Sequence, residues 1–181
     1  VNYVIKRHRP DVIINFAAET NVNKSLANPI AFSQTNVLGT LTLLESARYF
    51  WSKQNFKGKL FIQPSTYQVY GSTYNDGVFF IEDSNISPQN PYAASKASAD
   101  LIVKSSYDSY GFPAIIARSC QNYGPFQNIN EFIPSCIYNI LNNTEIPIKK
   151  DASVRREWIH VLDNCVALIR ILFYGKVGEI Y

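Results

Sequence analysis

Three short apolar runs constrain the fold most strongly. They span residues 12–16, 60–62 and 114–117, are rich in β-branched or aromatic residues, and are bounded by glycine or proline. None of them alternates between apolar and polar residues, which indicates strands that are buried on both faces. Strands of this kind are typical of parallel sheets with helices on both sides.

Helical patterns lie between these runs. Apolar residues recur at helical spacing between Val37 and Ala47. A second helix is predicted to begin after Asn90 as its N-cap, with Pro91 at its first position, and to end near Gly111. The alternation of strand and helix predicts crossover units and therefore an α/β fold with a parallel sheet.

The pattern changes after residue 125. A helix is predicted over 131–141, short strands at 146–148 and 158–161, and a final helix with Asp163 as its cap. This mixed composition favours insertions outside the main sheet over a separate domain.

Both ends of the sequence have the pattern of interior segments. Residues 1–6 are typical of the end of a helix and residues 178–181 of the beginning of a strand, and the chain contains no methionine. We therefore expect a piece of a longer protein.

Composition excludes several classes of protein. Hydrophobic residues make up 46% of the 181 residues and charged residues 17%, which supports a packed core and excludes a disordered charged chain. The net charge is +3 and the 17 basic residues are scattered, so nucleic-acid binding is not expected. No apolar run is long enough for a membrane span and no signal peptide is present, so no membrane partner is expected.

Cysteine and histidine contents add two expectations. The three cysteines are odd in number and widely spaced, which favours reduced thiols in a cytoplasmic protein. The two histidines, His8 and His160, have no ligand spacing around them, so no metal site is predicted.

The Tyr92-Ala93-Ala94-Ser95-Lys96 segment is the strongest candidate for chemistry. Tyr92 and Lys96 are four residues apart on a predicted helix and therefore share one face. A tyrosine moves protons near neutral pH only if its pKa falls by about three units from about 10, and a lysine cation one turn away supplies part of that change. The alternative is a surface pair, because the spacing alone is a weak pattern.

The residues that follow the three predicted strands strengthen this hypothesis. Ala17 and Ala18 follow the first strand, Ser65 and Thr66 the second, and residues 118–122 the third. In open α/β sheets ligands bind at the carboxyl ends of the strands, so small and polar residues at all three ends predict a binding site there.

The order of these segments resembles the extended short-chain dehydrogenase/reductase family of NAD-dependent nucleotide-sugar epimerases and dehydratases, and its dehydratase branch most closely. The similar segments are FAAET and NVNKS at 16–25, QTNVLGT at 34–40, STYQVYG at 65–71, PYAASKASAD at 91–100, NYGP at 122–125 and RREW at 155–158.

The resemblance implies part of a Rossmann-like doubly wound parallel sheet together with part of a small α/β substrate-binding region. Residues 1–125 would be the C-terminal part of the NAD-binding domain, and residues 126–181 a partial nucleotide-sugar region that returns to the main sheet. The family's Gly-rich phosphate loop would lie upstream of Val1, so we expect the isolated chain to bind NAD poorly.

The resemblance also implies roles for individual residues. Tyr92 would accept the proton of the sugar 4-hydroxyl as hydride leaves C4 for NAD. Lys96 would hold the nicotinamide ribose and lower the pKa of Tyr92, and Thr66 would hydrogen-bond the same hydroxyl.

Further positions match residues that line the two ligands. Besides Tyr92 and Lys96, the cofactor positions are Phe16, Ala17, Ala18, Thr35 and Asn122. Besides Thr66, the positions for the nucleotide-diphosphate sugar are Thr20, Gln121, Glu131, Phe132 and Arg156. Arg156 suits a pyrophosphate because its guanidinium donates two parallel hydrogen bonds, the alternative being a surface ion pair with Glu157.

Four positions at the sugar end depart from the dehydratase pattern. The catalytic Asp and Glu that follow the threonine in that branch are Tyr67 and Gln68 here. Tyr67 can still donate a proton, but the amide of Gln68 does not titrate and cannot take one from carbon. Gln121 stands in place of an asparagine, and Glu131 stands where a basic residue is expected.

Three functions therefore remain open. The first is a nucleotide-sugar dehydratase, and the second is a C4 epimerase or reductase of the same family, which needs no carboxylate pair. The third is a catalytically idle homologue that acts as a binding or dimerisation module. The family resemblance also implies a homodimer that forms through the helix that carries Tyr92.

Overall fold

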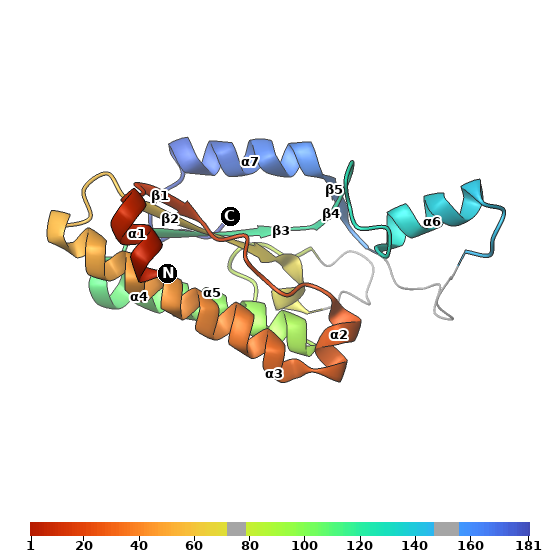
Figure 1. The fold of residues 1–181 in the computed structure, drawn as a ribbon, viewed down its shortest axis with the longest axis horizontal. Helices are drawn as coiled ribbons and strands as arrows, with labels where there is room; N and C mark the ends of the chain where they lie inside the picture. Colours follow the sequence, from red (N-terminus) through yellow and green to blue (C-terminus); the bar gives the residue numbers. More distant parts are fainter. Residues whose placement is uncertain (72–78, 147–155) are drawn as a thin grey trace.

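The centre of the molecule is a three-stranded parallel sheet. The computed structural model describes residues 1–71, 79–146 and 156–181. The strands are β1 (Val12–Ile14), β2 (Leu60–Thr66) and β3 (Ala114–Ser119), in the spatial order β1-β2-β3. Ile14 is paired with Ile62, and Ile62 with Ile115. The predicted α/β class with a parallel sheet is confirmed (Figure 1).

Two long helices, α4 (Gly39–Trp51) and α5 (Pro91–Tyr110), pack side by side on one face of the sheet (Figure 1). Their apolar sides meet the strands in a core where the rings of Trp51 and Phe112 stack with centroids 5.5 Å apart. Phe112 is fully buried and also contacts the rings of Phe56 and Phe61. Helix α4 is thereby fixed to the sheet at the end opposite the predicted binding edge.

Helix α7 (Val161–Tyr174) covers the other face, with Leu168 buried against the sheet (Figure 1). The prediction that Asp163 caps this helix is wrong. The helix begins at Val161, and the cap is His160, whose Nδ1 accepts a hydrogen bond from the Leu162 amide at 3.4 Å. The preceding strand runs directly into the helix, so its last residue takes the cap position and Asp163 falls within the first turn.

The N-terminal part of the chain is mostly helical. Its helical elements before α4 are α1 (Asn2–His8), α2 (Val22–Ala27), α3 (Pro29–Phe32) and the π-helix η1 (Ser33–Leu38). The last two continue directly into α4, so Asn36 lies inside a longer helical stretch. The helical stretch begins at Pro29 with Asn28 as its cap, because the Asn28 side chain accepts a hydrogen bond from the Ala31 amide.

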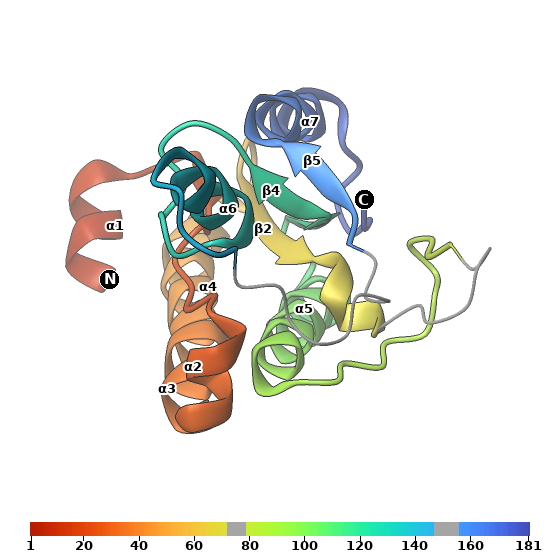
Figure 2. The same ribbon diagram turned by 90° about the vertical axis from the view of Figure 1, so that its right-hand side faces the viewer.

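A small second sheet lies beyond the carboxyl end of the main one. It pairs β4 (Gln121–Tyr123) with β5 (Trp158–His160) in parallel, and α6 (Phe132–Leu141) projects beside it (Figures 1 and 2). The strand β4 is not apparent from its polar sequence, because its partner lies 37 residues further on. The predicted strand at 146–148 extends outside the described residues.

The chain returns to the main sheet after α7. Ile180 pairs with Ile116 of β3, and the Tyr181 amide donates to the Ile116 carbonyl at 3.0 Å. The expected strand start at 178–181 therefore lies on the free side of β3. Two short 3-10 turns, η2 (Ser52–Gln54) and η3 (Tyr67–Tyr70), complete the elements of the described residues.

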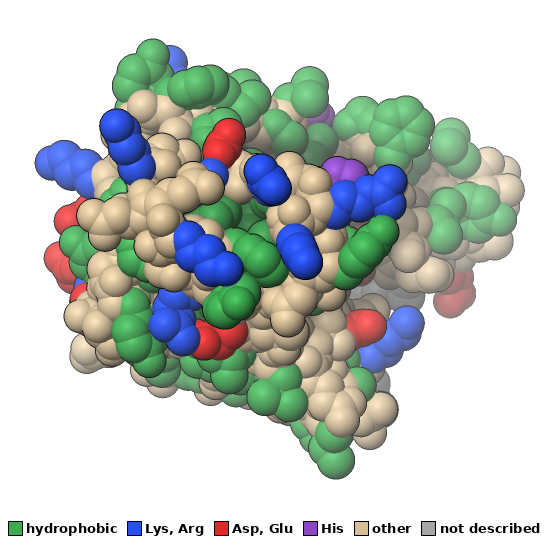
Figure 3. All heavy atoms as spheres, turned by 60° about the vertical axis from the view of Figure 1, so that its left-hand side comes forward, with side chains coloured by type: hydrophobic (Ala, Val, Ile, Leu, Met, Phe, Trp, Pro, Cys, Tyr) green, Lys and Arg blue, Asp and Glu red, His purple; other side chains and the backbone are tan. Residues whose placement is uncertain are grey.

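The surface at the α1 end carries mixed side chains. Figure 3 shows lysine and arginine side chains there among hydrophobic and acidic ones, without a single continuous stripe. Among the helices of the described residues, none has the length and apolar character that a bilayer span requires.

Candidate active site

The ends of the parallel strands bring the predicted site residues to one edge. Thr66, the last residue of β2, is paired with Ser119, the last residue of β3. The segment after β1 reaches the same edge, and Figure 2 looks toward it with α6 and the β4–β5 pair nearest the viewer. Residues from four parts of the sequence can therefore contact one ligand.

The start of α5 positions Tyr92. Asn90 is the N-cap, and its side-chain oxygen accepts a hydrogen bond from the Ala93 amide at 2.9 Å. Pro91 occupies the first position, and Tyr92 lies in the first turn with 9% of its surface exposed. The Thr66 side chain is also buried, and it is close enough to the phenol to act on its pKa.

Lys96 lies one turn further along α5 and is also buried. Its Nζ donates a hydrogen bond to the Pro64 carbonyl at 2.7 Å. Burial lowers the pKa of Lys96, and the nearby Asp100 carboxylate opposes this change. This hydrogen bond holds the ammonium near the carboxyl end of β2.

The pKa of Tyr92 departs from the expectation. Burial raises it to about 12, the hydrogen bond from Thr66 acts in the lowering direction, and Asp100, Tyr67 and Glu131 raise it further. The prediction of a lowered pKa is therefore wrong for the chain by itself. The physical reason is that the phenol is desolvated while the Lys96 ammonium is engaged by a backbone carbonyl.

A buried charge network supports the helix behind Lys96. Asp100 Oδ2 accepts hydrogen bonds from Ser65 Oγ and from Arg118 Nε, both at 2.9 Å. Arg118 also donates to the Tyr70 hydroxyl at 2.8 Å and lies over the Tyr70 ring. Burial raises the pKa of Asp100, and Arg118 is the main influence that lowers it.

Sequence reasoning did not identify this network. Asp100 lies four residues after Lys96 and therefore on the same helix face, and Arg118 is a charged residue at the end of a buried strand. Both are signals of a paired buried charge, since unpaired charges are rarely buried.

Asn36 fixes the segment after β1 to α5. Its side-chain amide donates to the Glu19 carbonyl at 2.9 Å and to Ser95 Oγ at 2.8 Å, and its oxygen accepts from the Glu19 amide at 2.8 Å. Ser95 Oγ in turn donates to the Tyr92 carbonyl. Asn36 is thus a positioning residue, because it joins the segment after β1 to the helix that carries Tyr92.

The predicted cofactor positions lie around these contacts. Phe16 is 63% exposed and Ala17 and Ala18 follow it on the fixed segment. Thr35 is exposed on the π-helix η1, a type of distortion that is frequent at functional sites. Asn122 lies on β4, and its buried Oδ1 has no hydrogen-bond partner.

The free Asn122 Oδ1 is open to a donor. A buried amide oxygen without a hydrogen bond is costly, so this atom is suited to accept one from a ligand that carries an amide, such as the carboxamide of NAD. No group of three or more His, Cys, Asp or Glu side chains in the described parts of the chain is arranged to hold a metal ion.

Two of the departures from the dehydratase pattern, Tyr67 and Gln68, directly follow Thr66. Gln68 Oε1 accepts a long hydrogen bond of 3.5 Å from Asn90, the cap of α5. Burial raises the pKa of Tyr67, Arg156 lowers it, and Cys120 and Glu157 raise it. Tyr67 is therefore within electrostatic reach of residues just before β5 and just after β3.

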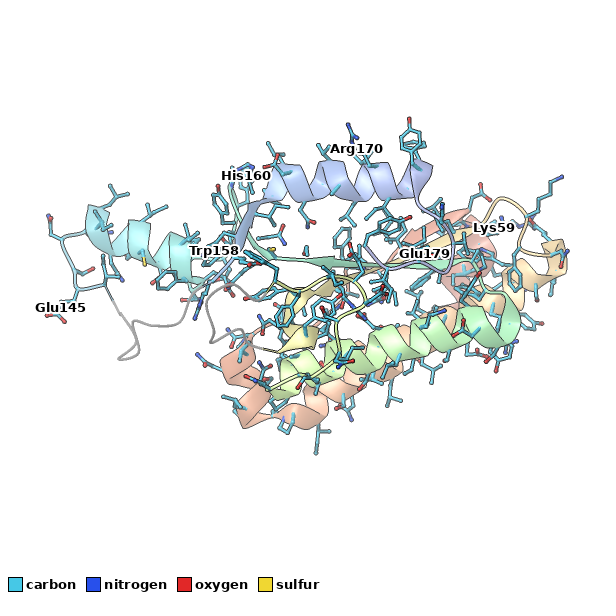
Figure 4. The ribbon with its side chains drawn as sticks, turned by 180° about the vertical axis from the view of Figure 1, so that it is seen from behind. Lys59, Glu145, Trp158, His160, Arg170 and Glu179 are labelled. Carbon is cyan, nitrogen blue, oxygen red and sulfur yellow. The ribbon has the colours of Figure 1, made fainter. Side chains whose placement is uncertain are left out.

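The predicted sugar positions beyond this point lie around α6 and β5. Arg156 lies over the ring of Phe132, 5.4 Å from its centroid, and this ring stacks on Trp158. Arg156 and Glu157 form no salt bridge, although both are described, so the surface ion pair is not observed. Figure 4 shows Trp158 and His160 together at the end of α7 nearest α6, far from Lys59.

Not all of the predicted sugar-binding residues contact one another in the structure. Glu131 at the cap of α6 is within electrostatic reach of Tyr92, and Gln121 is joined to Glu157 through its backbone amide. Thr20 is exposed at the start of the segment before α2, and no side-chain contact joins it to the other predicted positions.

Comparison with protein families gives one match over the entire chain. A model of the GDP-mannose 4,6 dehydratase family matches residues 1–181. Among curated relatives, the low-salt glycan biosynthesis protein Agl12 of Haloferax volcanii is 43% identical and covers 94% of this chain and 53% of the relative. The dTDP-glucose 4,6-dehydratase of Xanthomonas campestris pv. campestris is 37% identical and covers 100% of this chain and 52% of the relative.

Comparison with solved structures agrees. A double mutant of DesIV, a dTDP-glucose 4,6-dehydratase from Streptomyces venezuelae that was crystallised with NAD bound, has a TM-score of 0.90 and 38% identity. The match covers 100% of this chain and 54% of DesIV. The chain therefore spans about half the length of the relatives it matches.

Proposed function

This chain belongs to the GDP-mannose 4,6 dehydratase family, and on that basis we propose that it is part of an NAD-dependent nucleotide-sugar dehydratase similar to dTDP-glucose 4,6-dehydratase. The observation that carries the proposal is the burial of Thr66, Tyr92 and Lys96 at the carboxyl edge of a parallel sheet, with Tyr92 and Lys96 one turn apart on α5. Hydride transfer at C4 of a sugar needs a base at this position.

NAD, when bound, supplies the acceptor for the hydride. Tyr92 accepts the proton of the sugar 4-hydroxyl, and Thr66 holds the same hydroxyl and the phenol in line. Lys96 binds the nicotinamide ribose, and Asp100 keeps a negative charge beside the ammonium.

Tyr92 must lose its proton near neutral pH to act as this base. That requires a fall of about five units from the pKa that burial produces, or about 7 kcal/mol. Tyr92 can gain this stabilisation from two positive charges, the Lys96 ammonium and the ring of oxidised nicotinamide. The raised pKa of the chain by itself supports a base that is activated only when the cofactor is present.

The remaining predicted residues divide between the two ligands. Phe16, Ala17, Ala18, Thr35 and Asn122 line the cofactor under this proposal. Thr20, Gln121, Glu131, Phe132 and Arg156 contact the nucleotide-diphosphate sugar, with Arg156 on a phosphate. Residues 1–125 belong to the NAD-binding domain and residues 126–181 to the sugar-binding region, with α7 and the last strand returning to the main sheet.

Incubation of the whole protein with dTDP-glucose in heavy water tests the proposal. A dehydratase gives the 4-keto-6-deoxy product with solvent deuterium at C5. Tyr92→Phe removes one hydroxyl and should reduce turnover by about 10²-fold or more while the fold is retained. Full activity of this variant would show that the base is assigned wrongly.

A C4 epimerase or reductase is the second candidate, and Gln68 is the observation that favours it. An epimerase gives a C4 stereoisomer without deuterium at C5, because no proton leaves that carbon. A catalytically idle homologue gives neither product even when it binds NAD.

We further propose a homodimer that forms through α5. Leu101 and Tyr110 are exposed on this helix, and Leu41 and Tyr49 on the neighbouring α4. The three cysteines are free, which supports a reducing compartment such as the cytoplasm.

A further inference from the structure

The elimination step needs a base that Gln68 cannot supply. Loss of water from a 4-keto sugar requires a group that takes the C5 proton and another that protonates the departing 6-oxygen. An amide does not titrate, so a carboxylate from another part of the chain must lie near Tyr67 if this reaction occurs.

The pairing of β4 with β5 brings Glu157 to this place. The Gln121 amide donates to the Glu157 carbonyl at 3.2 Å, and Cys120 Sγ donates to Glu157 Oε2 at 3.6 Å. Cys120 directly follows Ser119, which is paired with Thr66, and Tyr67 directly follows Thr66. Tyr67 and Cys120 therefore follow paired residues at the ends of neighbouring strands. The Glu157 carboxylate accepts a hydrogen bond from the Cys120 thiol.

Electrostatics agree with this placement. Glu157 and Cys120 both raise the pKa of Tyr67, and burial of the phenol raises it most. Tyr67 therefore keeps its proton at neutral pH, as a proton donor must. The phenol of Tyr67 also raises the pKa of Tyr92, so the two tyrosines are within electrostatic reach of each other.

We propose that Glu157 is the base that takes the C5 proton and that Tyr67 is the acid that protonates the 6-oxygen. This inference rests on the proposed function, since it assigns the second half-reaction at the same site. It goes beyond the resemblance, which places both groups directly after the threonine. Glu157 is exposed and its carboxylate lies at the Cys120 thiol, so it is open to a bound sugar at this edge.

The step balances as follows. The C5–H electron pair forms the C5=C6 bond, and the proton goes to the Glu157 carboxylate. The C6–O bond breaks, and the oxygen takes the Tyr67 proton and leaves as water. Hydride that left C4 in the first half-reaction is then added to C6. The carboxyl proton of Glu157 exchanges with solvent, and Glu157 then protonates C5, so in heavy water C5 gains deuterium. Tyr67 recovers its proton from solvent.

Glu131 is the competing carboxylate, because it is also within electrostatic reach of Tyr92. It lies at the cap of α6, and it does not appear among the residues that shift the pKa of Tyr67. Glu131→Gln is therefore the matched control for Glu157→Gln, since both variants remove one carboxylate from the same edge of the site.

The test uses the whole protein with NAD and dTDP-glucose in heavy water. Two signals are followed separately: the absorbance of reduced nicotinamide, which reports oxidation at C4, and deuterium at C5. Glu157→Gln should still form reduced nicotinamide, should lose C5 exchange by about 10²-fold or more, and should accumulate the reduced cofactor. In Glu131→Gln, any loss should fall equally on oxidation at C4 and on C5 exchange, because Glu131 is assigned to sugar binding and not to removal of the C5 proton.

A rescue separates catalysis from structure. Gln68→Glu in the Glu157→Gln protein places a carboxylate directly after Tyr67 and should restore part of the C5 exchange. Normal exchange in Glu157→Gln alone, or a loss in Glu131→Gln of C5 exchange but not of oxidation at C4, would overturn the assignment. If the unaltered protein forms no 4-keto-6-deoxy product with deuterium at C5, the proposed function and this inference are refuted together.

Discussion

Single residues at this site are governed by burial. It raises the pKa of Tyr92 and of Asp100 and lowers that of Lys96, so each of these groups is pushed toward its neutral form. Hydrogen bonds and nearby charges then decide which of these three groups stays ionised. Asp100 has Arg118 and Ser65 on one oxygen, whereas its Oδ1 has no partner, so this carboxylate depends on the guanidinium.

The raised pKa of Tyr92 predicts a loss of stability at high pH. The unfolded chain loses this proton near pH 10, whereas the folded chain keeps it to about pH 12, so the folded state binds more protons in that window. The contribution of Tyr92 to the free energy of unfolding is therefore fully present below pH 10. It falls by up to about 3 kcal/mol between pH 10 and 12. Urea unfolding at several pH values should show a smaller decrease for Tyr92→Phe, and an equal decrease would contradict this assignment.

The Asp100–Arg118 pair predicts a large effect of removing the cation. Arg118→Met should reduce the free energy of unfolding by about 3–5 kcal/mol, because it leaves a buried carboxylate without its partner. The control is Arg48→Met, which removes an exposed pair with Glu45 and should cost about 0.5 kcal/mol.

A double variant completes this test by urea denaturation. Asp100→Asn added to Arg118→Met should recover part of the loss, since no charge then remains buried. An Arg118→Met effect as small as that of Arg48→Met would contradict the role given to the network.

At the scale of elements, α5 is specified by local sequence and η1 is not. The caps of α5 are Asn90, with its hydrogen bond to Ala93, and Gly111, which has a positive φ of 63°. Both are recognisable in the sequence because capping depends on adjacent residues. The π-helix η1 instead places Asn36 on Glu19 and Ser95, contacts that link distant parts of the chain.

The N-cap of α5 gives a prediction that joins stability to catalysis. Asn90→Ala should cost about 1 kcal/mol, because the Ala93 amide loses its acceptor, while Asn90→Asp should cost much less. Turnover of Asn90→Ala should also fall, since Tyr92 lies in the turn that this cap fixes. Thermal unfolding and steady-state kinetics of both variants check this, and equal behaviour of Ala and Asp would refute the capping role.

The whole molecule presents apolar side chains on both of its helical faces. On α4 and α5 these are Leu41, Tyr49, Leu101 and Tyr110, and on α7 Ile169 and Phe173 are among them. Exposed apolar area gathered on adjacent helices is typical of an interface. Of these two faces, only the one formed by α4 and α5 includes the helix that carries Tyr92.

The proposed homodimer gives a prediction at this scale. Leu101→Glu should convert a dimer into a monomer, because it places a charge in the apolar surface between two copies of α5. Ile169→Glu on α7 is the matched control and should leave the mass unchanged. Light scattering after gel filtration of the whole protein measures both, and a dimer that persists in Leu101→Glu would exclude α5 as the interface.

The sequence by itself determined the α/β class, the three parallel strands, the helix over 91–110 and the family, because these depend on periodicity, caps and short motifs. Tertiary structure alone decided the pKa of Tyr92, the role of Asn36 and the pairing of β4 with β5. Desolvation and contacts between distant segments arise only when the chain is packed. For the same reason the carboxylate beside Tyr67 could not be found by reading along the sequence, where Glu157 lies 90 residues away.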